Sequence, residues 1–327
     1  MSDPQPIKQR IFITGATGYI GRVVTELAVA EGCYDVHGLS RSDEGDARLR
    51  ALGATPVRGD LTTLDVLRRE SAAADIVLHL AFIHDFGMDY DEILRIDAAA
   101  IDALAEPLQG TGKPLITTSG TALVAPDPAG DETTEESPLA QARFSRRIRS
   151  ERHALSLSEK GTRASCIRLP PYVYGRGGGI GFVVMLMQMA VRNGESIYVD
   201  GGSVRTSDVH VDDAARLYLL AAQGARAGEL YNGTAATTVT MREMAEAIGA
   251  VLGLPVRSVS RDEAERKLGP FLAAIVQHEN RASNRKAVQQ LGWQPREVDL
   301  LTDIRSGSFV AVAEKLRGGE GGKIWVS

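Results

Sequence analysis

Largely apolar runs and amphipathic stretches alternate through the first half of the chain. Six short apolar runs predict strands buried on both faces. They cover residues 11–14, 34–39, 55–58, 76–80, 114–118 and 165–169. Between them apolar positions return with the period of a helix, over residues 20–28, 47–52, 62–73, 90–108 and 141–158. Strands that alternate with helices predict an α/β fold with a doubly wound parallel sheet, the Rossmann architecture.

The regular alternation ends after Leu169. Beyond it the pattern predicts strands over 196–199 and 204–210, and helices over 182–192, 212–222, 240–252, 261–268 and 285–291. The glycine-rich run 175–179 predicts a flexible loop. We therefore expect two units. Residues 1–169 form the first, to which residues 204–227 return, and residues 170–327 mainly form a smaller mixed unit.

Three glycines, Gly15, Gly18 and Gly21, join the first apolar run to the first helix. The first lets the backbone turn sharply, the second lets a pyrophosphate approach the main chain, and the third lets the helix pack on the strand. The start of the helix adds unpaired N–H groups and a partial positive charge. The turn predicts that residues 1–169 bind a dinucleotide and that 170–327 mainly bind the substrate. A purely structural glycine turn is the alternative.

Composition and charge argue against several classes of protein. The 327 residues are 43% hydrophobic and 24% charged, and the net charge of -5 favours neither a nucleic-acid nor a membrane-surface partner. The first ten residues lack the apolar core of a signal peptide, and the apolar stretch 182–191 is too short for a membrane span. Cys33 and Cys166 are expected to be buried thiols, which predicts a cytoplasmic protein. No spacing of His, Cys and carboxylates predicts a metal site.

Several motifs follow one another along nearly the whole chain. They are Thr14–Gly21, Gly59–Leu61, His79–Ala81, Thr118–Gly120, Arg168–Gly175, Val209–Asp213 and Leu291–Pro295. In this order they resemble the motifs of the extended short-chain dehydrogenase/reductase superfamily, of the NAD-dependent epimerase/dehydratase type. The resemblance implies an enzyme that uses a nicotinamide dinucleotide.

The resemblance also implies which residues hold the cofactor. In the first turn these are Gly15, Thr17, Gly18, Tyr19 and Ile20, and further along they are Arg41, Asp60, Leu61, Ala81, Phe82, Thr118, Arg147, Pro170 and Tyr172. Arg41 follows the second strand, where an arginine accommodates the 2′-phosphate of NADP and an acidic residue takes the 2′-hydroxyl of NAD. We therefore expect NADP(H), while Asp43 keeps NAD(H) as the alternative.

The catalytic residues depart from the pattern of the superfamily. Ser119 occupies the position of the hydroxyl that orients the substrate, with Thr118 and Thr121 as neighbouring alternatives, although a capping role would explain it equally well. The usual Tyr-x-x-x-Lys pair is absent, and Arg143 and Arg147 stand in its place. Arg147 can hold ribose hydroxyls. Arg143 cannot donate a proton, because the pKa of arginine lies above about 12.

Another group must therefore move the proton if the chain is a reductase. Tyr172 lies on the stretch expected beside the nicotinamide, and a phenol there could replace the missing tyrosine. His84, next to Asp85, follows the fourth strand and could act as acid or base near neutral pH. A packing role for Tyr172 and an ordinary polar loop at His84 are the alternatives.

Together these residues predict an NADP(H)-dependent oxidoreductase that acts on a small organic carbonyl, imine or activated alkene. Ser119 would orient the substrate, and Tyr172 or His84 would supply the proton. Two alternatives stay open: a catalytically silent NAD(P)-binding redox sensor, and a non-redox isomerase, epimerase or cyclase that retains the nucleotide. Resemblance to the superfamily also suggests a homodimer formed through residues 90–108 and 141–158.

Overall fold

The computed structural model describes residues 8–85, 87–140, 146–179 and 181–319. Its centre is a sheet of seven parallel strands in the order β10-β6-β5-β4-β1-β2-β3. These strands are β1 Gln9–Thr14, β2 Tyr34–Ser40, β3 Thr55–Arg58, β4 Ile76–His79, β5 Pro114–Gly120, β6 Arg163–Leu169 and β10 Leu230–Asn232. The six strands predicted for the first half of the chain are confirmed, and so is the doubly wound α/β fold.

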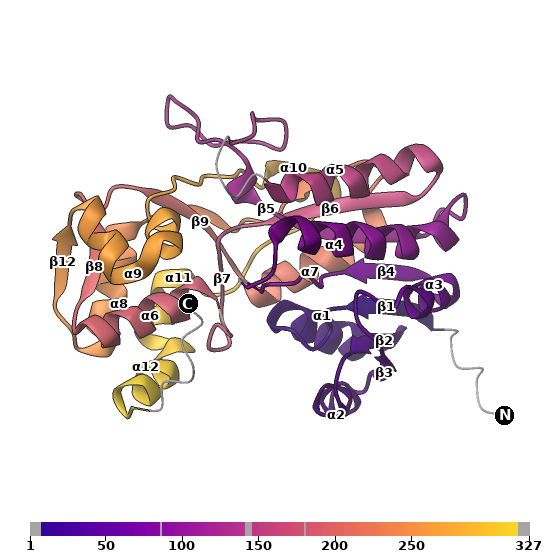
Figure 1. Ribbon diagram of the computed structural model, residues 1–327, viewed down its shortest axis with the longest axis horizontal. Coiled ribbons are helices and arrows are strands. Elements are labelled where there is room, and N and C mark those ends of the chain that lie inside the picture. The colour runs from indigo at the N-terminus through magenta and orange to yellow at the C-terminus, as the bar shows by residue number, and fades with distance from the viewer. Residues whose placement is uncertain (1–7, 86, 141–145, 180, 320–327) are drawn as a thin grey trace.

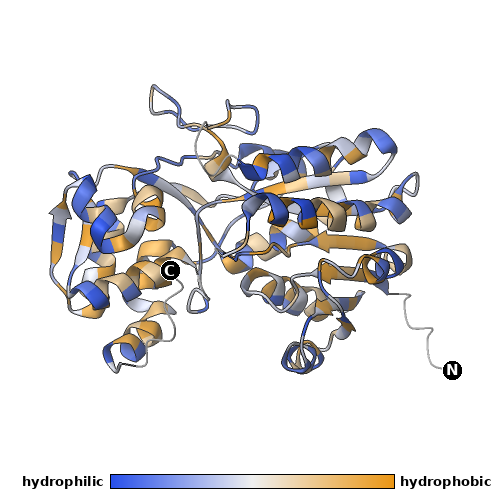
Figure 2. Ribbon diagram, viewed as in Figure 1, coloured by the Kyte–Doolittle hydropathy of each residue, from blue (hydrophilic) through white to orange (hydrophobic). Residues whose placement is uncertain are grey.

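Two layers of helices cover the large sheet (Figure 1). The helices that pack on it are α1 Tyr19–Ala30, α2 Asp43–Ala51, α3 Leu64–Ala73, α4 Tyr90–Ala105, α5 Ile148–Ser156, α7 Val211–Gly224 and α10 Arg285–Leu291. Side chains of β1 alternate between the layers, as the pleat of a strand requires. Ile11 and Ile13 pack in the core with α1 and α7, and Phe12 packs in the core on the side of α3 and α4. Figure 2 shows the central strands as the hydrophobic part of this unit and α5 as a hydrophilic outer helix.

A smaller unit lies beside the carboxyl ends of the large sheet (Figure 1). Its sheets have the strand orders β11-β9-β7 and β12-β8. The strands are β7 Tyr172–Tyr174, β8 Ser196–Val199, β9 Arg205–His210, β11 Ala236–Thr240 and β12 Val256–Val259. The helices are α6 Phe182–Asn193, α8 Met241–Leu252, α9 Arg261–Ile275, α11 Leu300–Ser306 and α12 Phe309–Arg317. This unit has its own apolar core. The first unit is completed from beyond residue 210, since β10 adds the last strand to the large sheet and α7 packs on that sheet.

Several expected boundaries are wrong. Helix α2 begins at Asp43, four positions before the expected start, because Ser42 accepts a hydrogen bond from the Gly45 N–H and acidic residues fill the first turn. Within the predicted helix 141–158, α5 begins at Ile148, and residues 141–145 lie outside the described part of the chain. Helix α9 continues past Leu268 to Ile275, with a break at Gly269, whose φ is 77°.

One cysteine differs from expectation as well. Cys166 is buried as predicted, but Cys33 is exposed, because it lies in the turn that precedes β2. The N-cap of α7 is His210, whose Nδ1 accepts a hydrogen bond from the Asp212 N–H. None of the helices in the described ranges is long and apolar enough to cross a membrane.

Candidate functional site

The first turn closes tightly between β1 and α1. Gly15 has a φ of +73°, and a Cβ there would lie 2.8 Å from the backbone nitrogen of Ala81. A Cβ on Gly21 would collide with the carbonyl oxygen of Gly15, so α1 can pack this closely only with glycine. Gly18 is the N-cap of α1, and no side chain caps the helix among the described residues. The uncapped N–H groups fit the pyrophosphate of a dinucleotide.

At the end of β2, the acidic residue that favoured NAD is already paired. Arg58 ends β3, and its Nη2 donates to Asp43 at 2.5 Å and to Asp46 at 2.7 Å. Arg41 is exposed and makes no ion pair within the described ranges. It lies close enough to Asp60 to help lower the pKa of that carboxyl, although hydrogen bonds from Thr62 lower it most. Arg58 therefore neutralises the carboxyl of Asp43, and the guanidinium of Arg41 is available to bind a ligand.

The end of β4 faces the first turn. Ala81 and Phe82 follow the strand, and the Ala81 N–H donates to Thr14 Oγ1 at 3.3 Å. The buried His79 joins Thr14 to α4, because its Nδ1 lies 2.8 Å from Thr14 Oγ1 and its Nε2 lies 3.3 Å from Asp97 Oδ1. The two backbone stretches expected to hold the cofactor are thus fixed to each other through side chains.

Arg147 lies where the family pattern has lysine. Its guanidinium carbon is 3.9 Å from the centre of the Phe82 ring, a cation–π contact, and its Nη2 donates to the Thr118 carbonyl at 3.1 Å. Arg147 Nε and Ser119 Oγ are both buried and have no hydrogen-bond partner among the described residues. Such donors are costly to bury unpaired, so the end of β5 fits a ligand that carries oxygen acceptors. Arg143 lies outside the described residues.

His84 lies next to this group. Its ring meets Phe82 edge-on at 5.3 Å between centroids. The side chain reaches solvent, yet the surrounding chain desolvates the imidazole and lowers its pKa, and the charge of Arg147 lowers it further. His84 is therefore neutral at pH 7 and lies beside Phe82, close enough to Arg147 for that charge to act on the imidazole.

Tyr172 lies in the core of the smaller unit. It is 1% exposed, and its hydroxyl donates to Met241 Sδ at 3.6 Å. Burial raises the pKa of the phenol. Pro170, which precedes it, is also buried. The structure therefore supports a packing role for Tyr172.

Hydrogen bonds and an ion pair with neighbouring elements hold Thr118 and the start of α5 in place. The Thr118 hydroxyl donates to the His79 carbonyl at 3.1 Å and lies 2.8 Å from the hydroxyl of Tyr218. Four residues after Arg147, Glu151 forms a buried two-point ion pair with Arg168 of β6, at 2.9 and 2.6 Å. The exposed fractions of these two side chains are 2% and 3%. This pair fixes α5, and with it the backbone that carries Arg147.

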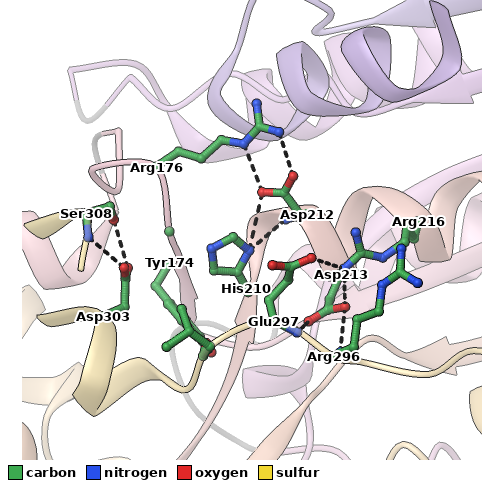
Figure 3. Close-up of polar contacts among 12 residues, drawn as sticks. Tyr174, Arg176, His210, Asp212, Asp213, Arg216, Arg296, Glu297, Asp303 and Ser308 are labelled. Carbon is green, nitrogen blue, oxygen red and sulfur yellow. Dashed lines mark hydrogen bonds and ion pairs between the residues drawn. The ribbon is translucent and has the colours of Figure 1, made fainter. Parts of the chain in front are cut away.

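The glycine-rich loop that follows β7 joins the two units (Figure 3). Arg176 binds Asp212 through Nε and Nη2, at 2.9 and 2.6 Å, and its Nη1 reaches Glu26 of α1 at 2.7 Å. The Tyr19 hydroxyl donates to the Gly175 carbonyl at 2.6 Å. Tyr19, predicted to bind the cofactor, thus also ties the first turn to the loop at 175–179.

Comparison with known proteins identifies the family. Residues 11–232 match the model of the NAD dependent epimerase/dehydratase family. The chain belongs to this family. It includes the extended dehydrogenase/reductases whose motifs the sequence resembles, so the nicotinamide dinucleotide site and the general enzyme character agree with expectation.

Relatives within the family differ in what they do. An uncharacterized protein of Schizosaccharomyces pombe is 40% identical over 92% of this chain and 99% of its own length. A 4-hydroxy-2-methyl-3-oxo-4-farnesyl-3,4-dihydroquinoline-1-oxide ketoreductase of Stigmatella aurantiaca is 29% identical over 90% of this chain and 89% of its own. A UDP-glucuronic acid 4-epimerase of Bacillus cereus, solved with UDP-glucuronic acid and NAD, shares the fold at a TM-score of 0.73 and 15% identity, covering 93% and 99% of the two chains.

The sequence reasoning missed two polar residues beside the site. Asp97 lies among the apolar positions 93, 94, 100, 101 and 104 of the helical pattern, and this unusual place for a carboxylate was a usable signal. Arg58 gave a weaker signal, because its contact with Asp43 depends on how β2 and β3 end side by side.

Proposed function

We propose that this chain is an NADP(H)-dependent oxidoreductase that reduces or oxidises a small organic carbonyl, imine or activated alkene. The observation that carries the proposal is the group at the end of β5. There Arg147 is held on Phe82 and on the Thr118 carbonyl, and the buried hydroxyl of the next residue, Ser119, has no hydrogen-bond partner among the described residues. A bound nicotinamide dinucleotide would supply or accept the hydride, and the chain's own residues would bind and polarise the substrate oxygen or nitrogen.

Three side chains would divide the remaining work. Ser119 would donate a hydrogen bond to the substrate heteroatom, and Arg147 would stabilise negative charge that develops there. His84, which has a pKa below its ordinary value, would exchange a proton with solvent on one side and the substrate on the other. Arg143 remains a candidate for the position of the missing tyrosine and would act there only as a fixed positive charge.

Arg41 supports NADP(H) as the cofactor. Its guanidinium is exposed and unpaired within the described ranges, whereas Asp43 is bound by Arg58. A 2′-phosphate would find a bidentate partner in Arg41 and little repulsion from the paired Asp43. An arginine–phosphate pair of this kind is worth about 1.5–3 kcal/mol, which corresponds to about 10- to 150-fold in affinity.

Two further functions each have an observation in their favour. The epimerases among the relatives support a non-redox reaction that retains the nucleotide. The packing role of Tyr172 leaves no phenol assigned to proton transfer, which supports a redox sensor without turnover. The ketoreductase relative and the solvent-connected His84 favour the oxidoreductase.

Binding and turnover measured separately test these functions. We expect NADPH to bind at least tenfold more tightly than NADH in a fluorescence titration. We expect Arg41→Ala to remove most of this preference, while Arg48→Ala, on the exposed side of α2, preserves it. NADH binding more tightly than NADPH would refute the role of Arg41.

A substrate screen then follows oxidation of NADPH with panels of carbonyls, imines and activated alkenes. Ser119→Ala and His84→Asn are expected to lower kcat by about 100-fold or more without changing NADPH affinity. His153→Asn, which changes a half-buried histidine paired with Asp102, is the matched control. Tight NADPH binding without turnover on any panel would refute the oxidoreductase and favour the sensor.

A further inference from the structure

A buried carboxylate lies behind the nucleotide site. Asp97 of α4 is 4% exposed, and its Oδ1 lies 3.3 Å from Nε2 of His79, which is 3% exposed. Burial alone would raise the pKa of this carboxyl, but the hydrogen bond and charge of His79, with Arg147 nearby, lower it instead. Asp97 is therefore an ionised acid inside the protein at neutral pH.

A chain of hydrogen bonds leads from the ionised carboxylate to the first turn. A carboxylate only accepts, so the His79 proton on Nε2 must point toward Asp97. The other ring nitrogen, Nδ1, shares a hydrogen bond with the Thr14 hydroxyl across 2.8 Å. The same hydroxyl oxygen accepts the Ala81 N–H at 3.3 Å. Ala81, Thr14, His79 and Asp97 therefore form one continuous chain of hydrogen bonds.

The chain ends on the backbone that faces the nucleotide. A Cβ on Gly15 would lie only 2.8 Å from the nitrogen of Ala81, so the peptide before Ala81 packs directly against the first turn. Phe82, the next residue, carries the stacked guanidinium of Arg147. Movement of Ala81 would therefore change both the space beside the turn and the position of Arg147.

We propose that Asp97 is a positioning residue of the nucleotide site, which acts through His79 and Thr14 to hold the peptide of Ala81 against the first turn. The inference rests on the proposed dinucleotide binding and goes beyond the residues that touch the cofactor. It predicts that α4, through Asp97, controls the affinity for the nucleotide.

The experiment is a double-mutant cycle on NADPH binding. Asp97→Ala removes the acceptor at one end, and Thr14→Val replaces the hydroxyl by a methyl of the same shape at the other. Each variant is titrated with NADPH by fluorescence at a temperature well below its melting temperature. We expect each to weaken binding about five- to tenfold, and the double variant to be no more than about twofold weaker than the worse single, because both break one chain.

Two variants separate positioning from general stability. Asp97→Asn keeps an oxygen that accepts from His79 and is expected to bind NADPH within about threefold of the wild type. Asp102→Ala lies on the same helix but is exposed and paired with His153, and it is expected to bind like the wild type. A loss of affinity in this control equal to that in Asp97→Ala would overturn the proposal.

The remaining outcomes of the binding experiment also test the proposal. Unchanged NADPH affinity in Thr14→Val would overturn the inference even if Asp97→Ala fails to fold, because the isosteric change empties no space. Effects that multiply in the double variant would show that Asp97 acts by another route and would overturn it too. A wild-type chain that binds neither NADPH nor NADH would overturn the proposed function and this inference together, whereas unchanged binding in both variants would overturn the inference alone.

Discussion

Replacing Asp208 by asparagine should make the protein more stable, and more so as the pH rises. Asp208 lies on β9 and is 1% exposed, and its Oδ2 is buried without a hydrogen-bond partner among the described residues. Burial, together with the nearby charge of Asp299, raises the pKa of Asp208 to about 8. The folded protein therefore holds this proton through the neutral range, whereas the unfolded chain releases it near pH 4.

The size of the effect follows from the two pKa values. Between about pH 4 and pH 8 the folded state binds one more proton than the unfolded state at this position, so wild-type stability falls by about 1.4 kcal/mol per pH unit. Above about pH 8 both states are ionised, and the loss reaches a plateau of about 5 kcal/mol. Asparagine has no such proton, so the variant avoids this fall.

Urea unfolding of the wild type and Asp208→Asn at pH values from 5 to 9 provides the assay. The difference in unfolding free energy should grow steadily up to about pH 8 and then become constant. Glu159→Gln serves as the control, because Glu159 is exposed and makes no ion pair within the described ranges. A difference between wild type and Asp208→Asn that stays the same from pH 5 to pH 9 would refute the reasoning.

The site and its supports give further expectations. Glu151→Gln should cost about 3–5 kcal/mol, because Arg168 loses its buried counter-charge; thermal unfolding measures this. Gly21→Ala should weaken NADPH binding at least tenfold, because the methyl would collide with the first turn; fluorescence titration measures it. Tyr172→Phe should leave turnover within about twofold, since the hydroxyl donates to a core methionine. Reduction should speed up as the pH falls into the acidic range, because His84, whose pKa burial lowers from its ordinary value, gains its proton there, and a pH–rate profile tests this.

A control or a contrary outcome accompanies each of these expectations. Gly201→Ala, where an added Cβ meets nothing within 4 Å, should leave NADPH binding unchanged. A Glu151→Gln protein as stable as the wild type would mean that Arg168 finds another acceptor. A large loss of turnover in Tyr172→Phe, with normal cofactor binding, would return the phenol to the catalytic group. A pH profile that His84→Asn leaves unaltered would remove His84 from proton transfer.

The sequence predicts the first unit well because its strands are long enough to carry a pattern. Strand 114–118, for example, begins with the apolar residues Pro114, Leu115 and Ile116, and parallel pairing buries both of its faces. Strand β7 has only three residues, Tyr172–Tyr174, too few to show a period, so the burial of Tyr172 could not be read from the pattern. The expectation that the phenol of Tyr172 lies beside the cofactor did not take this burial into account.

The glycines and hydroxyls of the candidate site were predictable, whereas its charge pairing was not. Gly15 and Ser119 act through local geometry at the ends of strands, which the sequence order reveals. The contacts of Asp43 with Arg58 and of His79 with Asp97 join residues 15 and 18 positions apart, and they depend on how neighbouring elements end. Of these two contacts, only that of Asp97 had a clear signal in the sequence, because a carboxylate within an apolar stripe is unusual.

The large sheet is completed by a strand from late in the chain, and this has a consequence for synthesis. β10, residues Leu230–Asn232, pairs with β6, and α7 covers α1 on one face of the sheet. A chain leaving the ribosome displays β6 as an open edge and α1 as a bare apolar face until about residue 232 has emerged. Strands β7, β8 and β9 of the smaller unit are synthesised during that interval. The nucleotide-binding unit is thus translated first and finished late, and the period of greatest exposure to aggregation falls between the two events.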